Sequence, residues 1–258
     1  MSAASRAVLP ARHAHMSYAD LTVDDPNPLK RWIHGRRFSD AVRVLRETRG
    51  AGLTRVLDFG TGDGEFLRRI GYDPGIQLAG YEPTPALLEQ AKRKLARLPG
   101  VILVDKLEHL KPGAFDYVFC MEVFEHLPEK EAGDAIEAIW WHLAPQGLAV
   151  VGVPHELFIP ALLKGIFRMS RRYGAFDAGF RNIVAATSGH APSERPVSEL
   201  APGVNYHPHH LGFDFRLLER RMLKRFNLVR RWFSPFPPLG AFLNVEVYYL
   251  LRKIPDKP

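Results

Sequence analysis

Cysteine is almost absent from this chain of 258 residues, which has Cys120 alone. A single cysteine excludes an intrachain disulfide, and the scarcity fits a reducing, cytoplasmic compartment. Long apolar runs are also missing, since none approaches the roughly 20 residues that a membrane-spanning helix needs. The N-terminal MSAASRAVLPARHAHM lacks the apolar segment of a secretion signal. We therefore expect residues 1–25 to form a flexible arm and residues 26–258 a single domain.

Acidic residues are scarce in the C-terminal part. Residues 1–150 carry 19 Lys and Arg against 20 Asp and Glu, whereas residues 151–258 carry 16 against 8, which places the whole net charge of +7 there. Such an asymmetry indicates contact with something anionic, such as a membrane surface, a phosphorylated substrate or nucleic acid. A solvated basic surface explains it equally well.

Short apolar runs alternate with amphipathic segments between residues 34 and 153. The runs are typical of buried strands, and the segments have the period of helices. This alternation predicts an α/β fold with a parallel, doubly wound sheet and helices on both faces. The expected strands are 54–59, 76–82, 101–105, 115–121 and 148–153, and the expected helices are 34–49, one beginning at 64, 85–98 and 129–143.

The rhythm changes after residue 154. Residues 156–212 contain one amphipathic helix, 157–172, and then a stretch rich in Pro, Gly and Ser, which we interpret as an insertion that caps the acceptor site. Residues 213–258 predict a helix over 214–226 and strands over 228–233 and 244–251. The proline-rich SPFPPLG between these strands is a turn, so the last strand should be antiparallel.

A glycine-rich turn follows the first expected strand in the sequence VLDFGTGDG. Gly60, Gly62 and Gly64 let the backbone approach a ligand closely, and Asp58 precedes them. Glu82 ends the second strand, where a carboxylate can accept hydrogen bonds from both hydroxyls of a ribose. The order of strand, glycine turn, helix, strand and acid predicts a nucleoside site.

Carboxylates surround this turn, since Asp63 and Glu65 follow Asp58 closely. Two like charges about 4 Å apart repel by roughly 1–4 kcal/mol, so the turn should disfavour a pyrophosphate and attract a cation. The GxGxG spacing also departs from the GxGxxG of dinucleotide sites. Both features favour S-adenosylmethionine, which carries a sulfonium and an ammonium group, over a nicotinamide or flavin dinucleotide.

Across about residues 50–155 the chain resembles the class I S-adenosylmethionine-dependent methyltransferases. The matching segments are VLDFGTGDGEF, GYEPTP, FDYVFCMEVFEHL and LAPQGLAVVGVP, the last with Gln146 in place of the usual glycine. The resemblance implies a Rossmann-like sheet of seven strands, mostly parallel with an antiparallel last strand. It also implies that the cofactor is held by Asp58, Gly60, Gly62, Gly64, Glu82, Pro83, Asp105, Cys120 and Met121, with Glu82 at the ribose, Asp105 at the adenine and Met121 at the sulfonium side.

Candidate catalytic residues follow the fourth strand. Glu122, Glu125 and His126 stand within five residues at the mouth of the sheet. His126 could be a general base, and Glu122 a further catalytic group. In the ubiquinone-pathway O-methyltransferases, which this segment resembles, two acids and a histidine may hold a divalent cation. We do not favour a metal here, and a third interpretation is that His126 only braces the following helix.

A second group of histidines ends the insertion. His207, His209 and His210 precede the C-terminal helix, and Pro208 stiffens the stretch. We expect one of them, His210, to face the acceptor pocket as a catalytic residue. A run of surface histidines is the alternative.

The acceptor is predicted to be a small molecule, a glycan or a lipid-linked compound that is methylated on oxygen. The 157–172 helix combines Phe158, Leu162 and Ile166 with Lys164 and Arg168, which suits an anionic lipid surface and a peripheral place at the inner face of a membrane. A helix that packs on the core would show the same periodicity.

Two other classes of function stay open. The C-terminal helix bears a basic face that nucleic acid could contact, formed by Arg216, Arg220, Arg221, Lys224 and Arg225. We do not favour an RNA methyltransferase, because no RNA-binding module is apparent. The remaining alternative is a protein that binds S-adenosylmethionine without catalysis.

Overall fold

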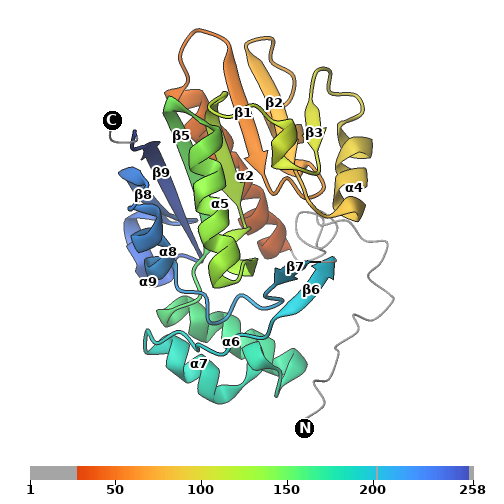
Figure 1. Ribbon diagram of the computed structural model, residues 1–258. Helices are drawn as coiled ribbons and strands as arrows, with labels where there is room; N and C mark the ends of the chain where they lie inside the picture. The colour runs from red at the N-terminus through yellow and green to blue at the C-terminus, as the bar shows by residue number, and fades with distance from the viewer. Residues whose placement is uncertain (1–27, 202, 256–258) are drawn as a thin grey trace.

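A seven-stranded sheet forms the centre of the computed structural model, which describes residues 28–201 and 203–255 (Figure 1). The predicted arm at 1–25 lies outside the described residues. The strands run in the spatial order β3-β2-β1-β4-β5-β9-β8. Their bounds are β1 Thr54–Phe59, β2 Ile76–Tyr81, β3 Ile102–Val104, β4 Phe115–Met121, β5 Leu143–Pro154, β8 Phe226–Ser234 and β9 Glu246–Lys253.

The strand directions confirm the predicted class of fold. Neighbouring strands from β3 to β5 pair in parallel, and β9 pairs antiparallel with both β5 and β8. The proline-rich stretch between β8 and β9 turns the chain, although it also contains the 3₁₀ helix η5 (Pro237–Leu239) and the short helix α9 (Gly240–Leu243). The central strands are apolar because both of their faces are covered.

Helices cover both faces of the sheet, and the pleat divides the core into two. In β1, Val56 packs with α2 (Pro28–Thr48) and α3 (Glu65–Ile70) on one face, whereas Leu57 packs with α5 (Glu129–His142) and α8 (Phe215–Met222) on the other. Helix α4 (Pro85–Leu95) joins the first face. The predicted helix at 34–49 therefore exists, but it begins at residue 28.

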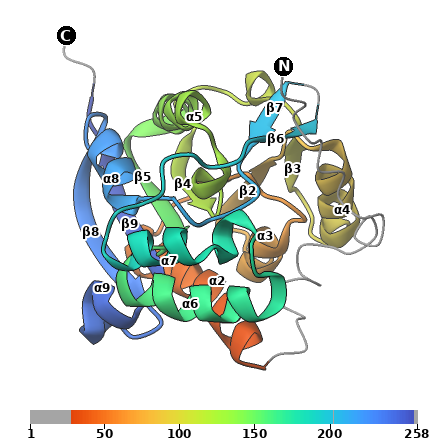
Figure 2. The same cartoon turned by 90° about the horizontal axis from the view of Figure 1, so that it is seen from below.

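The insertion after β5 contains more regular structure than the sequence predicted. Besides α6 (Phe158–Arg172) it holds the 3₁₀ helix η4 (Phe176–Ala178), helix α7 (Phe180–Thr187) and a hairpin of β6 (Ser198–Ala201) and β7 (Val204–Tyr206). Helices α6 and α7 lie across the end of the sheet toward which the parallel strands point, as the view from below shows (Figure 2). Among the described residues, no helix is both long and apolar enough to cross a bilayer.

Candidate active site

A cavity of about 300 Å³ lies where the carboxyl ends of β1, β2 and β4 meet. This is the position at which open α/β sheets bind ligands, because the loops that follow the strands diverge there. Predicted site residues that line the cavity are Asp58, Gly60, Gly62, Glu82, Pro83, Met121, Glu122 and His126. Further lining residues are Phe38 of α2, Phe66 of α3, and Asn205 and Tyr206 of β7, none of which the sequence singled out.

Glu82 lines the cavity and is only 5% exposed. Its carboxylate accepts one hydrogen bond from the amide of Gly62 and one from the amide of Thr84, both at 2.9 Å. Burial raises the pKa of Glu82, and these hydrogen bonds oppose the rise. The glycine turn and the segment after β2 are thus joined through this carboxylate, which keeps further lone pairs for hydroxyl donors.

The backbone of the glycine turn offers little to a phosphate. A dinucleotide site holds its pyrophosphate with amide donors at the start of the helix. Here the amides that already donate within the protein, to acceptors at 2.9–3.2 Å, are those of Gly60, Thr61, Gly62, Gly64 and Glu65. This use of the donors disfavours a dinucleotide more directly than the spacing of the glycines does.

The charge of the turn differs from the sequence-based expectation. Asp63 forms an ion pair with Lys94 at 2.6 Å, and Glu65 forms ion pairs with Arg68 and Arg69, both at 2.8 Å. Burial acts to raise the pKa of Glu65, but the two arginines outweigh it and hold the pKa at about 2. These two carboxylates are therefore neutralised by neighbouring cations, and the premise of three free negative charges was wrong.

Asp58, at the base of the turn, forms no ion pair with a cationic side chain among the described residues. It is 2% exposed and accepts the Thr61 hydroxyl at 2.6 Å. Burial raises its pKa to about 7, against the effect of the Thr61 hydrogen bond, and Glu82 adds to the rise. A cationic ligand beside Asp58 would favour its ionised form.

Four predicted site residues do not line the cavity, and their proposed roles stay predictions. Gly64 has a φ of 82°, and a Cβ there would meet the Leu95 side chain at 2.8 Å, so this glycine permits close packing of α3 on α4. Asp105 is 53% exposed and lies 3.5 Å from His109. Cys120 is buried on the opposite face of β4 from Met121. The fourth residue, His210, reaches the site through His126.

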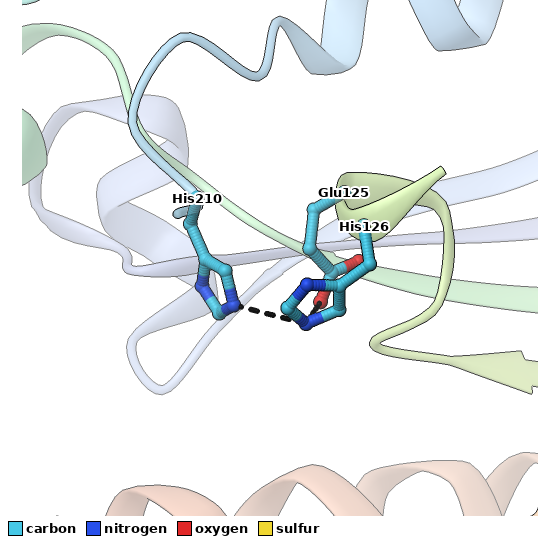
Figure 3. Close-up of side chains that lie close together, drawn as sticks. All are labelled: Glu125, His126 and His210. Carbon is cyan, nitrogen blue, oxygen red and sulfur yellow. Dashed lines mark hydrogen bonds and ion pairs between the residues drawn. The ribbon is translucent and has the colours of Figure 1, made fainter. Parts of the chain in front are cut away.

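His126 and His210 form a contact at the cavity, although 84 residues separate them (Figure 3). Their Nε2 atoms are 3.2 Å apart, and Nδ1 of His126 is 2.9 Å from the His207 carbonyl oxygen. Because a carbonyl only accepts, Nδ1 of His126 carries the proton, its Nε2 has the lone pair, and Nε2 of His210 donates to it. Burial lowers the pKa of His126 and lowers that of His210 further, so both rings are neutral at pH 7.

Glu125 lies behind this histidine pair and is fully buried. One of its oxygens is 3.8 Å from Nε2 of His126, and neither oxygen has a hydrogen-bond partner among the described residues. One ligand atom from each of Glu125, His126 and His210 falls within 4.8 Å of the others, so these three could hold a metal ion. This set differs from the trio expected from the sequence, because Glu122 is held elsewhere.

Glu122 belongs to a buried ionic group that local sequence patterns did not reveal. Arg37 of α2 lies 3.1 Å from Glu122 and 2.5 Å from Glu246, the first residue of β9. Arg37 is only 4% exposed, although it lies on the polar side of the helix. Glu122 also has a φ of 57°, a strained conformation for a residue with a side chain, and such strain is concentrated at functional sites.

This group of acids should make folding stability depend on pH. Burial raises the pKa of Glu122, Glu125 and Glu246 to about 8, although Arg37 opposes the rise in each case. The folded state then binds more protons than the unfolded state above about pH 5, so the free energy of unfolding should fall as the pH rises toward 8.

Glu125→Gln is expected to flatten this dependence, because an amide does not titrate. The slope should decrease by up to about 1.4 kcal/mol per pH unit. Urea unfolding of both proteins at several pH values between 5.5 and 7.5 measures it, with Glu89→Gln on the exposed face of α4 as the control. Equal slopes for wild type and Glu125→Gln would contradict the assignment.

The insertion supplies the remaining contacts of the site. Arg195 donates to the carbonyls of Glu125 and His209, at 2.5 and 2.6 Å, and so connects the loop after β4 to the histidine segment. Tyr206 stands with its ring centroid 6.5 Å from that of His126. Sequence patterns pointed to the histidines of this segment, but gave no signal for Arg195 or Tyr206.

Comparison with known proteins agrees with this geometry. Residues 57–149 match the family described as "Methyltransferase domain". A ubiquinone biosynthesis O-methyltransferase from Psychrobacter cryohalolentis is 33% identical over 140 residues, which are 50% of this chain and 54% of that protein. An uncharacterized methyltransferase from Oceanobacillus iheyensis is 30% identical over 118 residues, 45% of this chain and 54% of that protein. The aligned region thus spans about half the length of these relatives.

Solved structures extend the likeness to nearly the whole chain. The N-methyltransferase NodS from Bradyrhizobium japonicum, in complex with S-adenosyl-L-homocysteine, has a TM-score of 0.54 at 16% identity, with 90% of each chain covered. Magnesium protoporphyrin IX methyltransferase from Synechocystis has a TM-score of 0.54 at 17% identity, with 88% of each chain covered. At these identities the likeness is one of fold.

Proposed function

Since the chain belongs to the class I methyltransferase family by its domain at residues 57–149 and by its seven-stranded sheet, we propose that it transfers a methyl group from S-adenosylmethionine. The acceptor is a hydroxyl of a small molecule, a glycan or a lipid-linked compound. The observation that carries the proposal is the single cavity whose lining includes both Glu82 and His126. A single cavity can therefore contain both the nucleoside of the cofactor and the hydroxyl of the acceptor.

The residues of the cavity fit this cofactor. Gly62 has a φ of 56° and an open space where a Cβ would stand, so the turn leaves room for a ligand. Glu82 is placed to accept from ribose hydroxyls, and Asp58 to offset the charge of an ammonium group. Met121 also lines the cavity. When bound, S-adenosylmethionine supplies an electrophilic methyl group on its sulfonium.

His126 can take the proton that a hydroxyl acceptor must lose. The hydrogen bond from Nδ1 to the His207 carbonyl leaves Nε2 with a lone pair, and His126 lines the cavity. Without an acceptor this lone pair accepts from Nε2 of His210, so the acceptor hydroxyl must displace that donor before the proton is transferred. Proton uptake creates an imidazolium 3.8 Å from the Glu125 carboxyl, and a positive charge there would favour the ionised form of that carboxyl. This arrangement combines a base with the positioning that in-line transfer requires.

Nucleic acid is a weaker candidate for the acceptor than the sequence alone indicated. Three of the five basic residues on the C-terminal helix face are paired: Arg216 with Asp214, Arg221 with Glu129 and Arg225 with Glu137. Paired cations contribute little to the release of counterions that drives binding to phosphate backbones. We therefore keep the small or lipid-linked acceptor as the proposed class.

A transfer assay tests the proposed function. The purified protein is given S-adenosylmethionine with a tritiated methyl group and either a lipid extract or an aqueous extract, with and without a chelator. We expect label in an acceptor that is lost with His126→Asn, and retention of label with the chelator. Label confined to RNA would replace the proposed acceptor class, and no label in any fraction would favour a binding protein without catalysis. Loss with the chelator would assign a metal to Glu125, His126 and His210.

A further inference from the structure

Helix α6 has its two faces in an unusual orientation. Its charged side faces the protein: Lys164 lies 2.8 Å and Arg168 2.9 Å from the fully buried Glu156. Arg168 and Arg172 also contact the buried Asp177, at 3.5 and 2.5 Å. The sequence-based assignment of Lys164 and Arg168 to a cationic rim was therefore wrong. These ion pairs fix the helix with its apolar side outward.

The outward side of α6 is part of a larger apolar surface. Helix α6 contacts both α7 and α9, and the three helices lie on the face seen from below (Figure 2). Eleven of the twenty large apolar side chains that are exposed in the described residues belong to this region. We call them the apolar cap surface: Leu162, Leu163, Ile166, Phe167, Tyr173, Phe180, Val184, Phe236, Leu239, Phe242 and Leu243. Such a concentration on a soluble domain marks an interaction site.

The charge of this region has one sign. Across residues 157–189 and 235–243 the only acidic residue is Asp177, which is buried and paired with Arg168 and Arg172, whereas Arg171 and Arg181 are exposed. A second copy of the chain would have to meet this surface with the same two arginines, because a two-fold interface brings a patch against itself. Self-association would therefore place like charges together. Anionic headgroups around an apolar layer complement both properties.

We propose that the apolar cap surface docks on a membrane that contains anionic lipid, with its apolar side chains in the acyl boundary and Arg171 and Arg181 at the headgroups. This inference extends the proposed function and rests on it only for the assignment of the cavity to a methyl acceptor. The same insertion provides Asn205 and Tyr206 to the cavity wall, so docking would bring the acceptor half of the cavity toward the lipid. The acceptor class that fits is one with a lipid tail.

Sedimentation with vesicles tests the docking without any methyl transfer. The full chain is mixed with phosphatidylcholine vesicles, with or without phosphatidylglycerol, and the bound fraction is measured. We expect binding to the anionic vesicles that decreases at high salt, and at least tenfold weaker partitioning for Leu163→Ser/Phe167→Ser. The matched control is Tyr72→Ser/Val229→Ser, which removes two exposed apolar side chains elsewhere and should bind as wild type does. Arg171→Gln/Arg181→Gln should lose the preference for anionic lipid.

Three outcomes would overturn the proposal. They are no binding of the wild type to either vesicle, equal binding of Leu163→Ser/Phe167→Ser, or a dimer in sedimentation equilibrium that this variant abolishes. Thermal unfolding shows whether each variant is folded. Because the assay contains no S-adenosylmethionine, docking can fail while methyl transfer to an acceptor in the extracts succeeds, and the reverse is equally observable.

Discussion

Replacing His126 by alanine is expected to lower kcat for methyl transfer by about 100- to 10,000-fold, the range that a positioned base contributes. The affinity for S-adenosylmethionine should stay nearly unchanged, because the proposed contacts with the cofactor are made by Glu82 and the glycine turn and not by His126. Initial rates of label transfer and calorimetric titration with the cofactor measure the two quantities. His190→Ala, which alters an exposed histidine, is the control.

The pH profile of kcat distinguishes a general base at position 126 from a histidine that only supports the fold. Burial lowers the pKa of His126 below its ordinary value of 6.5, with Arg195 adding to the effect against the His207 carbonyl. A base must be unprotonated, so kcat should be constant near pH 7 and fall at lower pH with a midpoint below 6.5. His126→Asn should remove this limb. A profile of the same shape in that variant, or a small loss of kcat in both variants, would leave His126 with only a structural role.

Replacing Glu82 by alanine should weaken the binding of S-adenosylmethionine severely. Two charge-assisted hydrogen bonds to the ribose, at about 1.5–3 kcal/mol each, amount to ~3–6 kcal/mol, or a loss of roughly 100- to 10,000-fold. Calorimetry gives the dissociation constants directly. Glu89→Ala, on the exposed side of α4, should bind as the wild type does.

Glu82 also holds the amides of Gly62 and Thr84, so its removal can loosen the turn itself. Glu82→Gln distinguishes the two effects, because its amide oxygen still accepts one hydrogen bond while the negative charge is lost. If the loss arises from the ribose contacts, Glu82→Gln should be folded at the temperature of the titration, as thermal unfolding shows, and still bind weakly. Wild-type affinity in both variants would remove Glu82 from the binding site.

Residues that form the sheet could be predicted from the sequence, because local chemistry determines them. Strands such as β1 and β4 are apolar on both faces and end in turn-forming residues, so their bounds follow from composition alone. The hairpin of β6 and β7 was missed, since its strands are short and its surroundings are rich in Pro and Ser. Its Tyr206 lines the cavity, so part of the acceptor wall was missed with it.

Long-range ion pairs account for most of the site that the sequence did not predict. A helical period assigns Arg37 and Arg168 to polar faces, but it does not say whether a polar face meets water or a buried carboxylate. The partners that decide this are Glu246 for Arg37 and Glu156 for Arg168. Similarly, His126 and His210 were each identified as candidates, while their contact depends on how the whole insertion folds back.

The link between Arg37 and Glu246 joins parts of the chain that are 209 positions apart. During synthesis on the ribosome, Arg37 and Glu122 emerge long before their shared partner, which is the first residue of the final strand. A nascent chain that has formed only the strands up to β5 therefore contains Arg37 and Glu122 of this group but lacks Glu246. The buried group is complete only once β9 has been synthesised.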